Sequence, residues 1–151
     1  MFVRYEKLID RPFEQLLEAF ASPARLWVPQ LVQDPTAGTS YVLSELGAGP
    51  LAKEVRMHLS DAYVRPGRAV MPMRVVATGP EGLFPELDAD LELLETDGGR
   101  SKLVLQGTYR SPLGPVGTML DRKVLYRLRE RSLNNFVDQV ATLLTRASAA
   151  A

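Results

Sequence analysis

The residue types in this chain limit the chemistry that it could carry. It contains one histidine, His58, and no cysteine, which excludes disulfides, thiolate metal sites and thiol nucleophiles. The sequence has no GxSxG turn, no HExxH spacing and no glycine-rich phosphate loop. Serine-hydrolase triads, zinc sites of that kind and nucleotide-binding loops therefore have no support, and we expect neither a metal nor a cofactor.

His58 belongs to a predicted strand, in which successive side chains alternate between two faces. Glu54, Arg56 and Ser60 share its parity, whereas Met57 has the opposite parity. His58 is therefore expected on the face that meets water. A surface role is the main interpretation, and general acid–base catalysis is the alternative.

Flexible apolar side chains are more informative. Met57, Met71 and Met73 occupy inward positions of predicted neighbouring strands. Methionine is polarizable and adapts its shape, so it suits a surface that must fit an apolar ligand. Ordinary packing of the core is the competing interpretation.

A few polar residues share the parity of apolar neighbours. Tyr5, Asp61 and Tyr109 do so on predicted strands, and Ser132 does so on a predicted helix. A buried polar group needs a hydrogen-bond partner, so Tyr5, Asp61 and Ser132 could orient a carbonyl or hydroxyl group of a ligand. The alternative leaves Asp61 in water at a strand end and the tyrosine hydroxyls at the rim.

Length and charge narrow the class of protein. A chain of 151 residues suits one domain, and we predict a single domain over 1–146 with a frayed tail at 147–151. The 18 basic and 18 acidic side chains cancel, which argues against nucleic acid as a partner because phosphate binding needs a basic surplus. With no signal-like leader and no apolar run near the ~20 residues that cross a bilayer, we expect a cytoplasmic protein without stable membrane insertion.

The chain is expected to run from a strand through short helices to more strands. Residues 2–9 are rich in β-formers, Asp10 is a candidate N-cap, and Pro12 falls in the first turn of a short helix. A second short helix carries Trp27. Glycine and proline turns then delimit five strands, which we predict at 40–46, 51–64, 69–78, 86–96 and 100–111. Their short connections favour antiparallel pairing.

Each predicted strand has one apolar and one polar face, so the sheet should cover something on one side only. Leu91, for example, faces away from its neighbour Asp90. A three-residue loop at 97–99 would match polar faces across the last hairpin. The pairs expected from this register are Thr96–Arg100, Leu94–Lys102 and Glu86–Arg110.

From about Gly117 to Thr145 the chain has no proline and no interior glycine. Apolar residues recur there at helical spacing, namely Leu120, Val124, Leu128, Phe136, Val140 and Leu143. Such a helix would be roughly 40 Å long, enough to cross the sheet and close its apolar side.

Charge is unevenly distributed along the chain. Acidic residues gather on the predicted strand 86–96, and basic residues gather on the C-terminal helix. The main interpretation is a solvated helix face that lies beside an acidic strand. The alternative is a basic face that docks on a membrane or an acidic partner.

The order of these elements resembles the START-like helix-grip (SRPBCC) superfamily. The most specific parts of the resemblance are Ile9-Asp10-Arg11-Pro12-Phe13, Trp27-Val28-Pro29, and Gly107-Thr108-Tyr109 through Pro112-Leu113-Gly114-Pro115-Val116-Gly117 into Leu120-Asp121-Arg122. The last of these resembles bacterial members most closely. The superfamily includes START lipid-transfer domains, polyketide cyclases, the birch-pollen allergen family and coenzyme Q-binding START proteins.

The resemblance spans nearly all of 2–145 and implies an α+β fold. In that fold a curved six-stranded antiparallel sheet, in the order β-α-α-β-β-β-β-β-α, wraps around a long C-terminal helix. It also implies a cavity between sheet and helix that often holds an apolar ligand. It implies no shared reaction, because functions on one fold vary widely.

The leading hypothesis is the binding or carriage of a small hydrophobic molecule, such as a lipid, a quinone or a polyketide. The expected lining residues are Trp27, Met57, Met71, Met73, Leu91, Leu105, Tyr109, Leu120, Val124 and Leu128. A cyclase- or hydratase-type enzyme would need an ionisable group in the same cavity, for which Asp61, the tyrosines, Lys7 and Glu45 are the candidates. A protein-interaction module would need an exposed apolar patch or the basic helix face, and a homodimer could form through either.

Overall fold

The computed structural model describes most of the chain. The described residues are 2–23, 26–27, 32–34, 39–46, 53–77, 86–110 and 122–149. Within them, side chains are described everywhere except at 32–34, 39–46, 53–55, 77 and 122–132.

The elements follow one another in the order strand, helix, seven strands and helix. Their bounds are β1 Phe2–Ile9, α1 Phe13–Ala21, β2 Val32–Asp34, β3 Thr39–Leu46, β4 Lys53–Leu59, β5 Tyr63–Arg65, β6 Arg68–Ala77, β7 Glu86–Thr96, β8 Arg100–Arg110 and α2 Arg122–Ala149.

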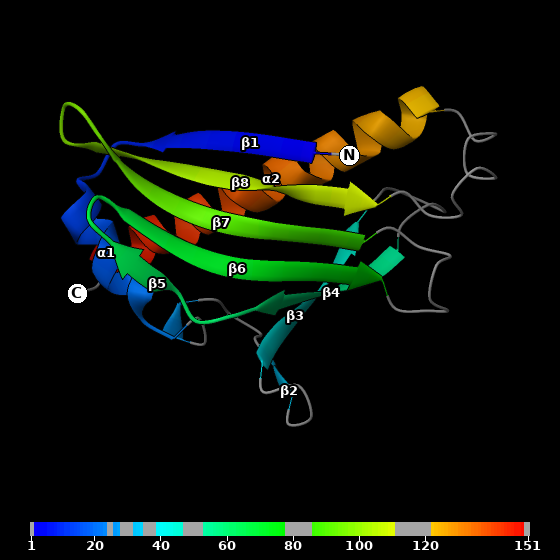
Figure 1. Cartoon of the computed structure of the whole chain (residues 1–151), viewed down its shortest axis with the longest axis horizontal. Coiled ribbons are helices and arrows are strands. Elements are labelled where there is room, and N and C mark those ends of the chain that lie inside the picture. The colour runs from blue at the N-terminus through cyan, green and yellow to red at the C-terminus, as the bar shows by residue number, and fades with distance from the viewer. Residues whose placement is uncertain are drawn as a thin grey trace.

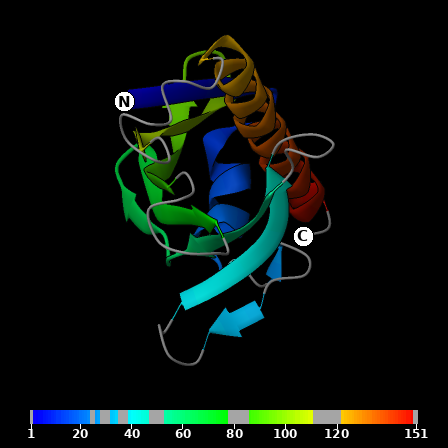
Figure 2. The same ribbon diagram turned by 90° about the vertical axis from the view of Figure 1, so that its right-hand side faces the viewer.

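The described strands form one antiparallel sheet in the order β1-β8-β7-β6-β4-β3-β2, and β5 pairs with β6 beside this path. The long helix α2 crosses one face of the sheet, and α1 lies at one end of that same face (Figure 1). Figure 2 shows how the sheet curves around both helices, from β1 to β3. The predicted α+β architecture, a curved antiparallel sheet around a C-terminal helix, is confirmed.

The six predicted strands correspond to β1, β3, β4, β6, β7 and β8. Two strands of three residues, β2 and β5, accompany them. The predicted strand 51–64 is divided between β4 and β5, because its pairing with β6 is interrupted.

The interruption is a bulge at residues 60–62. Leu59 pairs with Met73, and Tyr63 pairs with Val70. The three residues between Leu59 and Tyr63 therefore face only two residues of β6. Because one extra residue reverses the alternation of every side chain beyond it, the inward parity predicted from β4 does not continue into β5.

The register of the last hairpin is as predicted. Thr96 lies opposite Arg100, Leu94 opposite Lys102 and Glu86 opposite Arg110. Gly98 and Gly99 have positive φ angles of 80° and 71°, which a side chain would make costly. The three-residue loop thus aligns the polar faces of β7 and β8.

The first helix starts later than predicted. Its N-cap is Pro12, which has extended backbone angles and no capping side chain, so the prediction that Asp10 caps the helix is wrong. The Pro12 carbonyl accepts hydrogen bonds from the amides of Gln15 and Leu16. Of the second predicted short helix, which was expected from Ser22-Pro23 to near Pro29, the structure describes 22–23 and 26–27, and the rest lies outside the described residues.

The last helix extends beyond its predicted end. It is helical to Ala149, so residues 147–149 of the expected frayed tail continue α2. Ala147 packs against the core, and the Ser148 hydroxyl donates to the Thr145 carbonyl at 2.9 Å. The buried stripe consists of Leu133, Val137, Val140, Ala141 and Leu144, while the predicted stripe residues Phe136 and Leu143 are only partly buried.

Candidate functional site

The apolar face of the sheet is the face that α1 and α2 cover. Among the predicted lining residues, Trp27, Met57, Met71, Met73, Leu91 and Leu105 are all buried in one hydrophobic cluster. They share this cluster with Phe13, Leu16 and Phe20 of α1 and with the buried stripe of α2. Tyr109 is partly buried and packs against its edge. The parity argument therefore placed the described strand residues of this set on the correct side.

The remaining lining candidates cannot be placed. Leu120 lies outside the described residues. Val124, Leu128 and Ser132 belong to α2, but their side chains lie outside the described ones.

Of the polar residues predicted to orient a ligand, one is buried and one is exposed. Tyr5 is buried in the cluster, opposite Leu105 on the neighbouring strand. Asp61 is exposed, because it lies in the bulge where the alternation of β4 ends. The structure therefore does not bring Asp61 to the interior.

The inner face is not uniformly filled with large side chains. Gly107 of β8 pairs with Ala89 of β7, between the rows that contain Leu91 and Leu87. A Cβ on Gly107 would fall on the backbone of β7, within 2.5 Å of the Cα of Ala89. The absence of a side chain lets the two strands approach closely at this position.

The side chain of Trp27 has one polar atom, which has no hydrogen-bond partner among the described residues. Its ring stacks on Phe20 with the ring centroids 6.3 Å apart. The indole Nε1 is buried and has no hydrogen-bond acceptor among the described residues. Buried donors normally have a partner, so this atom distinguishes Trp27 from the purely apolar residues around it.

A second feature lies on the opposite, outer face of the sheet. There the described residues line an open hollow of about 730 Å³ that crosses β4, β6, β7 and β8. Its polar and charged side chains are His58, Ser60, Arg74, Asp88, Asp90, Gln106 and Thr108. His58 therefore lies on the predicted outer face, but as part of a concave surface.

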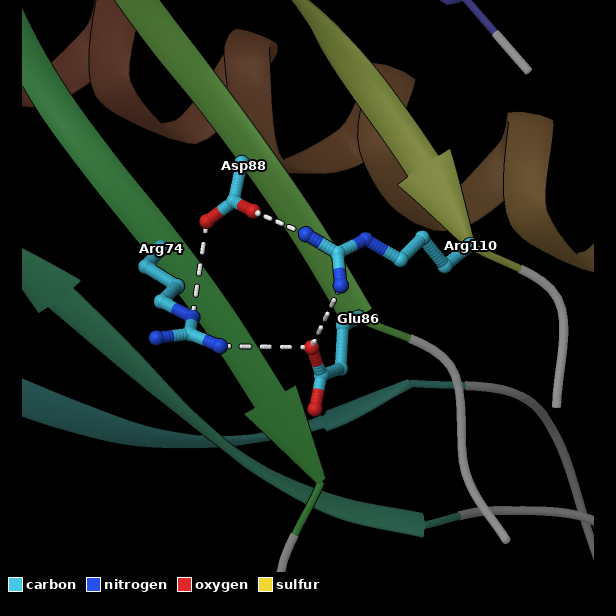
Figure 3. A network of polar contacts seen from close by, with 4 residues as sticks. All are labelled: Arg74, Glu86, Asp88 and Arg110. Atoms are coloured by element: carbon cyan, nitrogen blue, oxygen red, sulfur yellow. Dashed lines mark hydrogen bonds and ion pairs between the residues drawn. The ribbon is translucent and has the colours of Figure 1, made fainter. Parts of the chain in front are cut away.

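Four charged residues form a closed network at one end of this hollow (Figure 3). Arg74 contacts Glu86 at 3.3 Å and Asp88 at 3.4 Å. Arg110 contacts Asp88 at 3.2 Å and Glu86 at 4.0 Å. Each carboxylate thus faces two guanidinium groups from the neighbouring strands β6 and β8. Glu86 and Asp88 of β7 are thus compensated within the sheet, on the face away from α2. The interpretation of a basic helix face beside an acidic strand stays a prediction, because the basic side chains at 122–131 lie outside the described ones.

At the other end, one carboxylate is buried on the outer face. Glu92 is 4% exposed and accepts hydrogen bonds from Arg68 at 2.6 Å and from Gln106 at 2.9 Å. Its cross-strand neighbours Val70 and Val104 are also buried. Alternation predicts an outward Glu92 but not its burial, which requires apolar neighbours on both adjoining strands.

Asp90 lies between these two groups and has no ion-pair or hydrogen-bond partner within the described part of the chain. Burial raises its pKa, and the charge of Glu92 raises the pKa further, while Arg68 lowers it. Among the described residues that line the outer hollow, Asp90 is therefore the carboxyl group without a direct partner, and Asp88 is the paired one.

The interior offers little for acid–base chemistry. Among the described residues, the buried side chains that carry a polar or charged group are Glu92, on the outer face, and Ser101, Tyr5 and Trp27. The Ser101 hydroxyl donates to the carbonyl of Arg11 at 2.8 Å. Lys7, an enzyme candidate from the sequence, is exposed and pairs with Asp138 of α2 at 3.2 Å. The side chain of Glu45 lies outside the described ones.

Comparison with known proteins gives a fold and no family. No protein-family model matches the chain, and no curated protein sequence matches it. Among solved structures, a conserved protein from Geobacillus kaustophilus has 8% identity and a TM-score of 0.62, with 97% of each chain covered. The ZhuI aromatase/cyclase from Streptomyces sp. R1128 has 19% identity and a TM-score of 0.57, with 97% of this chain and 93% of the other covered. Ara h 8.0201 has 12% identity and a TM-score of 0.55, with 100% and 99% covered.

The chain has the helix-grip fold. At these identities the similarity establishes the fold alone, so the predicted resemblance is confirmed at the level of architecture. Among the described residues of this helix-grip domain, no group of three or more histidine or acidic side chains is arranged to hold a metal ion. Within the same residues, no helix is both long and apolar enough to span a membrane.

Proposed function

We propose that this protein binds a small hydrophobic molecule between the inner face of its sheet and α2. The observation that carries the proposal is the one-sided character of the sheet. Apart from Ser101, the buried inward residues of β4, β6, β7 and β8 are apolar, and both helices cover this face. A binding site for such a ligand needs mainly apolar lining with few polar contacts.

Three methionines on this face support adaptation to a ligand. Met57, Met71 and Met73 belong to the same buried cluster, and methionine fits irregular apolar shapes at low cost. The small residues Ala89 and Gly107 leave less side-chain volume in the middle of the inner face. The predicted ligand class is a lipid, a quinone or a polyketide-like molecule.

Binding is favoured over catalysis. One structural neighbour is an aromatase/cyclase, which keeps a cyclase- or hydratase-type activity as the alternative. That activity would need an acid or a base in the interior. Asp61 and Lys7 are both exposed, which leaves Tyr5 as the buried candidate among the described side chains. The cytoplasmic location and the homodimer stay predictions.

Native mass spectrometry of the protein purified from its own source tests the proposal. We expect a reproducible mass increment that disappears after extraction with organic solvent. The stripped protein should then bind a fluorescent hydrophobic probe with one-to-one stoichiometry. Protein that carries no increment and also fails to bind the probe would exclude this function.

A further inference from the structure

Trp27 has a hydrogen-bonding requirement that the described part of the protein does not meet. The side chain is 7% exposed, and its Nε1–H group has no acceptor there. Tryptophan N–H groups usually find a partner when buried, because an unsatisfied buried donor costs free energy. The unpaired donor is therefore evidence for an acceptor that the described residues do not supply.

The local structure holds the indole ring in the interior. After α1 ends, the amide of Leu26 donates to the carbonyl of Pro23 at 2.9 Å. This turn leaves Leu26 exposed and Trp27 buried. The indole then stacks on the fully buried ring of Phe20 with an interplanar angle of 25°. Packing thus keeps the N–H group out of solvent.

The buried polar side chains are engaged elsewhere. Glu92 is on the outer face, where Arg68 and Gln106 donate to it. The Ser101 hydroxyl donates to the carbonyl of Arg11. Apart from Tyr5, the other buried side chains of the described part are hydrocarbon or thioether groups. No buried carboxylate or amide in this part of the interior therefore competes for the Trp27 donor.

We infer that Trp27 Nε1 donates a hydrogen bond to an oxygen acceptor of the bound ligand. The inference rests on the proposed function and deepens it, because it defines the ligand class as hydrophobic molecules that carry a carbonyl or similar acceptor. A ligand that presents only hydrocarbon at this position leaves the donor unpaired. A ligand that presents an N–H group places two donors against each other.

Three rigid probes of nearly equal shape separate these cases. Fluorene carries a methylene group, fluorenone carries a carbonyl at the same position, and carbazole carries an N–H group there. Satisfying one buried donor should make fluorenone bind about tenfold more tightly than fluorene. Carbazole should bind no better than fluorene.

The indole group reports its own hydrogen bond. The chain contains one tryptophan, so a nitrogen-edited NMR spectrum shows a single indole N–H signal. Fluorenone should move this proton downfield, and fluorene should move it much less. This measurement uses the unmodified protein and does not depend on whether a variant folds.

The substitution Trp27→Phe provides the matched variant. Phenylalanine retains an aromatic ring beside Phe20 but has no N–H group, so the tenfold preference for fluorenone should disappear while fluorene binding persists. Equal binding of the three probes to the unmodified protein, with an unmoved indole signal, would overturn the inference and leave the proposed function standing. Binding of none of the probes would overturn the proposed function itself.

Discussion

On β7, Leu91 and Asp90 are neighbours in sequence but lie on opposite faces of the sheet. Leu91 is 1% exposed and lies beneath the helices, whereas Asp90 lies in the open outer hollow. The inner face buries apolar groups, and among the described residues its unpaired donor is the indole N–H of Trp27. Most charges that the structure describes on the outer face of β7 are paired, and Asp90 is the carboxyl group without a direct partner among the described residues.

This comparison shows where stability and specificity reside. Burial of large apolar side chains contributes roughly 1.5–3 kcal/mol each, whereas exposed ion pairs contribute about 0–1 kcal/mol. The inner face should therefore dominate the free energy of unfolding. The outer face should contribute to the free energy of unfolding mainly through its few buried side chains.

The largest expected effect is on the inner face. Leu91→Ala should lower the free energy of unfolding by about 2–5 kcal/mol, because it removes a buried side chain from the centre of the cluster. Thr108→Ala, an exposed change on the outer face of β8, should alter it by under about 0.5 kcal/mol. Urea unfolding followed by circular dichroism measures both. Equal losses would show that the two faces do not differ as described.

The next effect concerns the position where β7 and β8 approach most closely. Gly107→Ala should cost about 1–3 kcal/mol, because its Cβ would overlap the backbone of β7 at Asp88 and Ala89. At Gly98 an added Cβ meets nothing within 4 Å, but φ is +80°, so Gly98→Ala should cost only the strain of a left-handed alanine, about 1–2 kcal/mol. Thermal unfolding of both variants tests this. A silent Gly107→Ala would contradict the close approach.

A smaller loss of stability is expected when the buried carboxylate of the outer face loses its arginine partner. Arg68→Met should cost about 1–2 kcal/mol, because it removes the closest donor from the buried Glu92. Arg74→Met is the matched control on the same strand. Its partners Glu86 and Asp88 keep Arg110, so its cost should be under about 1 kcal/mol. Denaturant unfolding should rank the two variants in this order, and the reverse order would refute the distinction between buried and exposed pairs.

The smallest effect follows from the raised pKa of Asp90. The folded protein holds this proton more tightly than the unfolded chain does, so the contribution of Asp90 to stability is largest below the ordinary aspartate pKa. Stability is then lost as pH rises through the raised pKa. Asp90→Asn should therefore stabilise the protein at neutral pH, by roughly a few tenths of a kcal/mol after solvent screening. The gain should vanish at acid pH.

Asp88→Asn is the control for that change. Asp88 pairs with Arg74 and Arg110, so its neutralisation should destabilise the protein at neutral pH. Thermal unfolding at neutral and acid pH measures whether each of the two substitutions stabilises or destabilises the protein. A destabilising Asp90→Asn would show that the Asp90 carboxylate is compensated after all.

Much of the fold could be predicted because its signals are local. Alternation places Met57, Met73 and Leu91 inward, and the structure buries all three. The two glycines of the last hairpin predict its loop, and its register follows. Helical spacing predicts α2 itself. It does not predict that Leu133 and Val137 belong to the buried stripe, because apolar spacing alone leaves the rotation of a helix about its axis uncertain by one residue.

The candidate site was less predictable, since it depends on contacts between distant residues. Trp27 could be proposed as a lining residue, but its unpaired N–H could not, because that depends on every group around the ring. The outer hollow gave no sequence signal beyond alternating polar residues. Its lining comes from four strands and includes Gly107, where β7 and β8 approach closely.

The sequence alone determined which side chains face the helices along each unbroken strand, because that choice depends only on a period of two residues. The tertiary structure decided where the period breaks, at residues 60–62, and thereby moved Asp61 to the surface. It also decided that Glu92 is buried between Val70 and Val104 and that the Trp27 donor has no described partner. These outcomes depend on which strands become neighbours and on how closely they pack, and local periodicity does not encode either.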